Sequence, residues 1–302
     1  MYTKELIISE HVRKIKKWVE KGGPDEFEWE DFNKWIEILF HDKEKYEFTK
    51  EDMIIIQNAF GESIKVDTLQ GRSINKPFGY PGDFLMIDRF YTYKTIDDKN
   101  FEKWDKLCLK MKGTYSLRNR KEYFIKLLLE KVKKYNSNFT VLNIASGPCR
   151  DLKEFFQIEY ECNMKCDCLE QDLQAINYAK CVLNGYNEKV DFICKNAIKF
   201  YTDKKYDLIW SGGLFDYFTD KIFIRLLKRY YDFLNIDGEI VIGNFSPKNP
   251  SRNYMELFEW NLYYRDEEKL LELAKSCGFN LKYVCVDAEK ENINLFLHIK
   301  RH

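Results

Sequence analysis

The feature that most constrains the fold is the alternation of short apolar segments with helical patterns from residue 140 to the end of the chain. Seven segments have the length and the β-branched or aromatic content of buried strands. They are TVLNIA, MKCDCLEQD, KVDFICKNA, YDLIWSGG, GEIVIGNFSP, LKYVCVDA and NINLFLHIK. Strands that alternate with helices predict an α/β fold with a doubly wound, mostly parallel sheet. A ligand of such a sheet binds beyond the carboxyl ends of the strands.

The first part of the chain has a different pattern. Amphipathic helices are predicted at residues 4–21, 28–40 and 49–60, with Thr49 as an N-cap. Residues 71–91 are expected to form a long ordered loop that leads into a helix. A long helix then begins at about Ser116. We therefore expect a mainly helical domain over residues 1–115 and an α/β domain over residues 116–302.

Composition excludes several classes of protein. The 49 basic and 49 acidic residues cancel, so no nucleic-acid partner is expected. No apolar run approaches the length of a membrane span or a signal peptide, and nine cysteines without such a signal fit a reducing, cytoplasmic compartment. Cys162, Cys166 and Cys168 lack a second ligand pair at zinc-like spacing, so no metal is expected. The composition does not indicate an oligomeric state.

The stretch VLNIASGPCRDLKEF, residues 141–155, predicts a strand, a tight loop and a helix N-terminus. That arrangement is typical of nucleotide-binding sites. The dinucleotide fingerprint G-x-G-x-x-G requires three glycines, and only Gly147 is present, which disfavours a nicotinamide oxidoreductase.

Residues 115–302 resemble the class I S-adenosylmethionine-dependent methyltransferases, whose fold is a Rossmann-like seven-stranded sheet. The family's first motif, h-h-[DE]-h-G-x-G-x-G, places Asn143 at the acidic position. It places Ala145, Gly147 and Cys149 at the three glycines. The resemblance implies that Asn143, Ala145, Ser146 and Gly147 bind S-adenosyl-L-methionine, with Asn143 bonding a ligand amine or a bridging water.

The ends of the next strands complete the expected cofactor site. Glu170 ends the second strand, where a carboxylate accepts hydrogen bonds from ribose hydroxyls, and Asp172 either joins it or caps the following helix. After the third strand, the resemblance places Asn196 and Ala197 against the adenine. The remaining cofactor positions, at the end of the fourth strand, are Ser211 and Gly212.

Several blocks narrow the resemblance to a bacterial subgroup described as 3-hydroxypalmitic acid methyl ester biosynthesis-type methyltransferases. They are KPFGYPGDFLMIDRFY, SLRNRKEYF, GLFDYFTD, GNFSPKNPSRNYMELFEW and YYRDEEKL. The resemblance implies a reaction region formed by Asp216, Tyr217, Tyr80 and Arg252, and both Arg252 and Arg265 are candidates for fixing a carboxylate.

The implied activity is methylation of a small-molecule acceptor. A carboxylate needs no general base, and the motif loops contain no histidine, which favours O-methylation of a fatty-acid-like carboxylate. Two alternatives remain: N-methylation of a small amine with Asp216 as base, and a catalytically silent cofactor-binding module with a partner-binding helical N-terminus.

The helical domain is expected to act as a lid, with Tyr80 and Asp83 of the KPFGYPGDF loop facing the active site and with Arg118 and Arg120 nearby. The alternative is a packing domain whose glycine-proline loop merely turns the chain.

Overall fold

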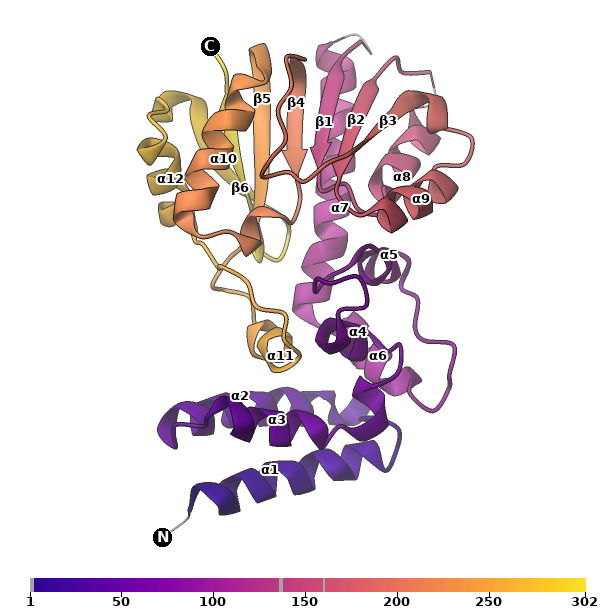
Figure 1. Cartoon of the computed structure of the whole chain (residues 1–302), viewed down its shortest axis with the longest axis vertical. Coiled ribbons are helices and arrows are strands. Elements are labelled where there is room, and N and C mark those ends of the chain that lie inside the picture. The colour runs from indigo at the N-terminus through magenta and orange to yellow at the C-terminus, as the bar shows by residue number, and fades with distance from the viewer. Residues whose placement is uncertain (1–2, 136–137, 160) are drawn as a thin grey trace. The chain divides into compact units, whose positions relative to one another are not determined.

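The computed structural model describes residues 3–135, 138–159 and 161–302, and the chain forms two compact units (Figure 1). One unit comprises Met1–Tyr115 and Pro250–Asn261, and the other comprises Ser116–Asn249 and Leu262–His302. The main division falls at the predicted boundary. Residues 250–261 differ from the prediction, because they pack with the helical unit.

The helical unit is built from short amphipathic helices that bury aromatic side chains. The helices are α1 (Lys4–Val19), α2 (Trp29–Lys45), α3 (Lys50–Asn58), α4 (Leu69–Asn75), α5 (Phe84–Thr92), α6 (Glu102–Lys110) and α11 (Arg252–Leu257). The three predicted helices are confirmed. Thr49 caps α3, since its side chain accepts a hydrogen bond from the N–H of Asp52 at 3.2 Å.

The expected loop at residues 71–91 is largely helical instead, because two capped helices, α4 and α5, occupy most of it. The side chain of Thr68 accepts from the N–H of Gly71, and that of Asp83 accepts from the N–H groups of Leu85 and Met86. Only residues 76–83 form the connection.

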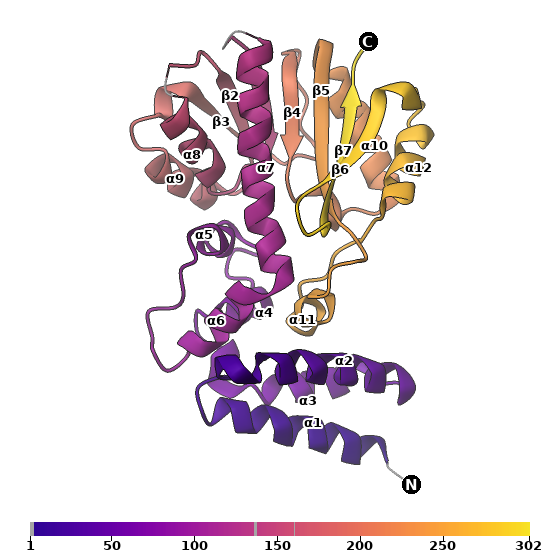
Figure 2. The ribbon, with the colours of Figure 1, turned by 180° about the vertical axis from the view of Figure 1, so that it is seen from behind.

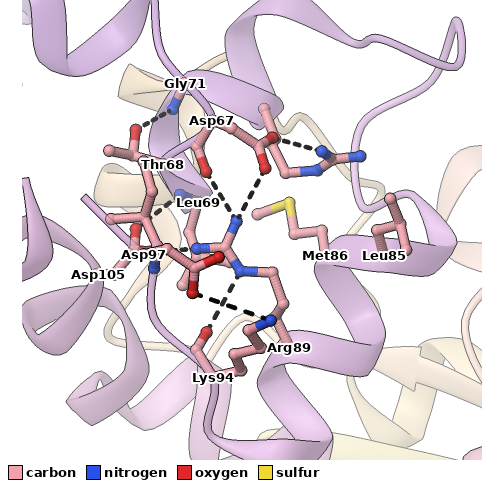
Figure 3. A network of polar contacts seen from close by, with 12 residues as sticks. Asp67, Thr68, Leu69, Gly71, Leu85, Met86, Arg89, Lys94, Asp97 and Asp105 are labelled. Carbon is pink, nitrogen blue, oxygen red and sulfur yellow. Dashed lines mark hydrogen bonds and ion pairs between the residues drawn. The ribbon is translucent and has the colours of Figure 1, made fainter.

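A buried network of charges fixes these helices to one another (Figure 3). Arg89 of α5 forms an ion pair with Asp105 of α6 and donates to the carbonyl of Asp67 at 2.7 Å. Asp105 also accepts from the N–H of Leu69 at 2.7 Å and from that of Ile96 at 2.6 Å. Each buried charge therefore has both a counter-charge and hydrogen bonds.

Residues 250–261 join the helical unit through aromatic packing and backbone bonds. The rings of Phe60 and Phe258 lie 5.0 Å apart, and Ser73 donates to the carbonyl of Phe258 at 2.7 Å. The side chain of Gln57 donates to the carbonyl of Leu257 at 2.8 Å. The sequence pattern assigned this segment to the α/β domain because it follows a strand directly.

The second unit contains a seven-stranded sheet in the order β3-β2-β1-β4-β5-β7-β6. The strands are β1 (Thr140–Ile144), β2 (Lys165–Glu170), β3 (Val190–Cys194), β4 (Tyr206–Ser211), β5 (Leu234–Phe245), β6 (Val284–Ala288) and β7 (Asn294–Lys300). β7 is antiparallel to both of its neighbours, and the other pairs are parallel. The predicted α/β, doubly wound sheet is confirmed.

Helices cover both faces of this sheet. They are α7 (Lys112–Lys134), α8 (Arg150–Ile158), α9 (Leu173–Val182), α10 (Asp220–Asp232) and α12 (Glu267–Ser276). Side chains of α7 and α8 pack into one core, and those of α10 and α12 pack into the other. Figures 1 and 2 show these two layers from opposite sides. No helix within the described ranges is long and apolar enough to cross a membrane.

Candidate functional site

The loop between β1 and α8 holds an unusual backbone. Ala145, Gly147 and Cys149 have φ angles of 54°, 56° and 53°, so alternate residues lie in the left-handed region. Those are the three positions at which the family's motif has glycine. An L-residue with a Cβ pays about 1 kcal/mol for this conformation. The loop therefore has the backbone of a glycine-rich loop, although Ala145 and Cys149 stand at two of the three positions.

Gly147 borders open space. A Cβ built on it would meet no heavy atom within 4 Å, so nothing inside the protein excludes a side chain there. Its positive φ still favours glycine. Such a position offers a backbone surface that a ligand can approach closely.

Two polar groups beside the loop lack partners. The amide nitrogen of Asn143 and the hydroxyl of Ser146 are buried and bond no residue that the structure describes. Buried polar groups are nearly always paired, so these atoms fit a ligand or a bridging water. The unpaired atom of Asn143 is a donor, which suits an acceptor or a bridging water, and the predicted bond of Asn143 to a ligand amine stays a prediction.

Glu170 connects the end of β2 to the same loop. Its carboxylate accepts from the N–H of Gly147 at 3.1 Å, of Gln171 at 2.8 Å and of Asp172 at 3.1 Å. Burial raises the pKa of Glu170 despite the lowering effect of those bonds. The structure thus brings together Glu170 and Gly147, which are 23 residues apart. Asp172 caps α9 by accepting from the N–H of Gln174 at 2.8 Å, as one of its two predicted roles required.

Asn196 and Ala197 lie after β3, at the same edge of the sheet. The amide of Asn196 donates to the side chain of Gln171 at 2.6 Å and accepts from the N–H of Ile198 at 2.8 Å. The carbonyl of Ala197 accepts from the hydroxyl of Tyr230 at 2.9 Å. These bonds orient both residues, and their contact with adenine stays a prediction.

The end of β4 accommodates an arginine. Arg120 of α7 is buried and donates to the carbonyl of Gly212 at 3.0 Å. A Cβ on Gly213 would lie 2.5 Å from its guanidinium nitrogen, so a side chain at this position would force the guanidinium to move. Ser211, which directly precedes Gly212, is also buried. The predicted cofactor contacts here are Ser211 and Gly212, and they stay predictions. Gly213 was not among the predicted cofactor residues and lies against Arg120.

Two buried carboxyl groups lie near the charge of Arg120. Burial raises the pKa of Asp216 to about 6, against the N–H of Phe245 and the charges of Arg120 and Arg265, which lower it. Burial likewise raises the pKa of Asp151 to about 6, against the N–H of Leu152 and the charge of Arg120. Sequence reasoning missed Asp151, which resembles an ordinary acidic residue in the first turn of a helix. Groups with shifted pKa values beside a binding loop are candidates for chemistry.

The other predicted reaction residues are distributed over both units. Tyr217 is half-buried in the 3₁₀ helix Phe215–Tyr217 beside Asp216. Tyr80 and Arg252 belong to the helical unit, so their participation stays a prediction. Arg252 is exposed and donates to Glu256 at 2.6 Å, one turn further along α11.

Asp83 has a structural partner for its charge. Arg72 donates to both of its carboxylate oxygens, at 3.0 Å each through one nitrogen, and the side chain is 1% exposed. Its predicted orientation toward the active site stays a prediction. The charge is neutralised within the helical unit.

Within the described ranges, no group of three or more histidine, cysteine or acidic residues is arranged to hold a metal ion. Cys149, Cys166 and Cys168 are buried together, with neighbouring sulfur atoms 3.8 Å apart. Burial contributes to the raised thiol pKa values of all three, which suits a packing role.

Comparison with known proteins agrees with this geometry. No protein-family model matches the chain. A curated relative from Ilyobacter polytropus, named malonyl-[acyl-carrier protein] O-methyltransferase 1, is 27% identical over 132 residues. That match spans 44% of this chain and 43% of the relative, so the chain matches less than half of that protein's length.

Solved structures resemble larger parts of the chain in fold. A protein from Bordetella parapertussis, described as a possible exported protein, is 14% identical with a TM-score of 0.65 and covers 99% of this chain and 97% of its own. The magnesium protoporphyrin IX methyltransferase of Synechocystis with bound S-adenosylhomocysteine is 11% identical with a TM-score of 0.50, covering 72% and 98%. Together with the strand order and the antiparallel β7, these likenesses give the identification: the chain has the fold of the class I S-adenosylmethionine-dependent methyltransferases.

Proposed function

We propose that this protein is an S-adenosylmethionine-dependent methyltransferase that acts on a small molecule. The observation that carries the proposal is the loop after β1, where three alternate left-handed residues place Gly147 against open space and next to Glu170. The unpaired groups of Asn143 and Ser146 add hydrogen-bonding capacity at that place. S-adenosylmethionine, when bound, supplies an activated methyl group.

The chain's own residues would bind and orient the reactants. Glu170 would accept a hydrogen bond from a ribose hydroxyl, since a carboxylate has about four acceptor sites and its three backbone bonds leave one of them. The backbone at Gly147 would take the close approach of the cofactor. Methyl transfer is an in-line displacement, so alignment and exclusion of water matter more than acid–base strength.

We favour a carboxylate acceptor. The buried charge of Arg120 lies at the reaction edge, where it would attract an anion. The curated relative is named as an O-methyltransferase of a malonyl group on an acyl-carrier protein, which is consistent with this chemistry. The second candidate is an amine, favoured by Asp216, whose pKa of about 6 leaves it ionised and able to accept a proton at neutral pH.

The stability of the product distinguishes the two acceptor classes. The purified protein is incubated with a radiolabelled methyl donor and with panels of carboxylates, thioester-linked malonyl groups and amines. A methyl ester releases methanol in alkali, whereas an N-methyl group does not. We expect alkali-labile label. Label that is stable in alkali would support an amine acceptor instead. Cofactor binding with no labelled product in any panel would support the catalytically silent cofactor-binding module.

A further inference from the structure

Arg265 follows residues 250–261, the segment that packs with the helical unit. It lies close to the candidate reaction residue Asp216. Its side chain is 2% exposed, and the sequence suggested that it fixes a substrate carboxylate. The structure contradicts that role, because every nitrogen of the guanidinium already donates within the protein. Nε donates to Asp220 at 3.0 Å, Nη1 to the carbonyl of Phe215 at 3.2 Å and to Asn244 at 2.8 Å, and Nη2 to Asp220 at 2.9 Å and to the carbonyl of Phe218.

These bonds enclose the segment that carries Asp216. The carbonyls of Phe215 and Phe218 flank Asp216 on both sides, so one guanidinium holds the whole turn. The backbone around Arg265 makes further bonds to the same region. The N–H of Tyr263 donates to the carbonyl of Asp216 at 2.7 Å, and the N–H of Phe245 donates to its carboxylate at 2.6 Å.

Asn244 completes the enclosure. It accepts from Arg265 through its side-chain oxygen, and its amide nitrogen donates to the carbonyls of Tyr263 and Phe245 at 2.9 Å each. The end of β5, the turn after β4 and the residues after the inserted segment are therefore joined in one network. Removing the guanidinium would leave two backbone carbonyls and one amide oxygen without this donor.

From this geometry we infer that Arg265 is a positioning residue, which holds Asp216 in place and sets its charge for the reaction. The inference rests on the proposed function. It assigns Arg265 no contact with substrate or cofactor.

The pH dependence of the rate should reveal how the charge of Arg265 affects the ionisation of Asp216. The charges that act on Asp216 are those of Arg120 on α7 and of Arg265, and Arg265 is itself paired with Asp220 on α10. Lys269 on α12 forms an ion pair with Asp220 at 3.0 Å. Removal of the Arg265 charge raises the pKa of Asp216. For an amine acceptor the rate falls below this pKa, because the base is protonated. For a carboxylate acceptor the rate falls above it, because two anions repel each other.

The test measures kcat/KM against pH for the parent enzyme and for Arg265→Gln and Arg265→Lys. The part of this plot in which kcat/KM changes with pH is its pH limb, and its midpoint reports the pKa of Asp216. In Arg265→Gln we expect the pH limb to move up by about 1 pH unit, the lower end of the shift that an opposite charge produces. Arg265→Lys keeps the charge, so its limb should stay near that of the parent while kcat falls. A purely structural arginine would lower activity in both variants and leave the limb where it was, and that result would overturn the inference.

Two further measurements separate this inference from its premises. Asp220→Asn changes a side chain that is 43% exposed, so the variant should fold, and loss of its negative charge should move the limb downward. An unmoved or raised limb in that variant would contradict the electrostatic role. Carbon-13 NMR titration of Asp216 gives the same comparison without activity. Absence of methyl transfer by the parent enzyme contradicts only the proposed function, whereas an unchanged NMR titration in Arg265→Gln contradicts only the role of Arg265.

Discussion

At the scale of single residues, the loop after β1 combines a glycine-like backbone with two side chains that do not favour it. Ala145 is exposed and has a φ of 54°, so its methyl group makes little buried contact to offset the strain. We expect Ala145→Gly to raise the free energy of unfolding by about 0.5–1 kcal/mol, the usual scale for relieving such a conformation. Urea denaturation measures this change.

Cys149→Gly is the informative comparison. Cys149 has nearly the same φ, 53°, but its side chain is fully buried, so the loss of packing should cancel the relief of strain. Destabilisation by Ala145→Gly would show that the left-handed backbone is not strained there.

Gly147→Val should separate folding from binding. A Cβ at this position meets no heavy atom within 4 Å, so the variant should fold with a penalty of about 1–3 kcal/mol from its φ. We expect it to lose S-adenosylmethionine binding, because the side chain occupies the space that the ligand needs. Gly185→Val is the matched control, with a φ of 89° and equally open surroundings in the turn that precedes β3. Equal cofactor affinity in the two variants, by calorimetry, would contradict the proposal that the cofactor binds against the backbone at Gly147.

At the scale of secondary-structure elements, the pair of Arg72 and Asp83 holds α4 against the start of α5. Asp83→Asn removes the buried counter-charge of Arg72 and leaves only the exposed carboxylate of Asp67 as its ion-pair partner. Breaking a buried ion pair typically costs about 3–5 kcal/mol. We expect a large fall in the thermal midpoint, whereas Asp97→Asn, whose side chain is 94% exposed, should change it little. A stable Asp83→Asn protein would mean that the pair does not hold these elements. Tyr80→Phe is therefore the cleaner test of the lid hypothesis.

Glu239 joins β5 to β7 and α7. Burial alone would raise its pKa, but the hydrogen bond with His298 and the charge of Lys131 lower the pKa to about 2. The folded protein therefore gains stability that is complete above the usual value of 4.5 and is lost as the pH falls toward 2. A shift of this size corresponds to about 3 kcal/mol.

Glu239→Gln isolates this contribution. The difference in unfolding free energy between parent and variant should be largest above pH 4.5 and should shrink as the pH approaches 2, when Glu239 becomes neutral like the glutamine. A difference that stays constant across this range would contradict the assignment. Comparison with the variant is necessary because Asp151 and Asp216 have the opposite effect. Their pKa values are raised to about 6, so they lower the free energy of unfolding as the pH rises.

At the scale of the whole molecule, the sequence predicted the sheet because short segments rich in β-branched, aromatic and other apolar residues alternate with helical patterns. It did not reveal the antiparallel β7, since strand direction depends on connections. The helices α4 and α5 were missed because glycine and proline in KPFGYPGDF dominated the interpretation and the capping role of Asp83 was not recognised. The segment 250–261 was misplaced because aromatic contacts distant in sequence decide where it packs.

In the candidate site, too, some features could be predicted from the sequence and others depend on the folded structure. Strand-end residues such as Gly147 and Glu170 could be predicted, because parallel strands bring their carboxyl ends to one edge. The network around Arg265 could not, since hydrogen-bond saturation is a property of the folded chain. The left-handed backbone at Ala145 and Cys149 is likewise visible only in the structure.

The most direct test of the central claim is calorimetric titration of the protein with S-adenosylmethionine, beside Glu170→Ala and with a nicotinamide dinucleotide as control ligand. We predict saturable binding of S-adenosylmethionine to the parent protein and no binding of the dinucleotide. The affinity of Glu170→Ala should be weaker by about 1–3 kcal/mol, the scale for loss of a hydrogen-bonding partner. Failure of the parent protein to bind S-adenosylmethionine, or an unchanged affinity in Glu170→Ala, would contradict the account.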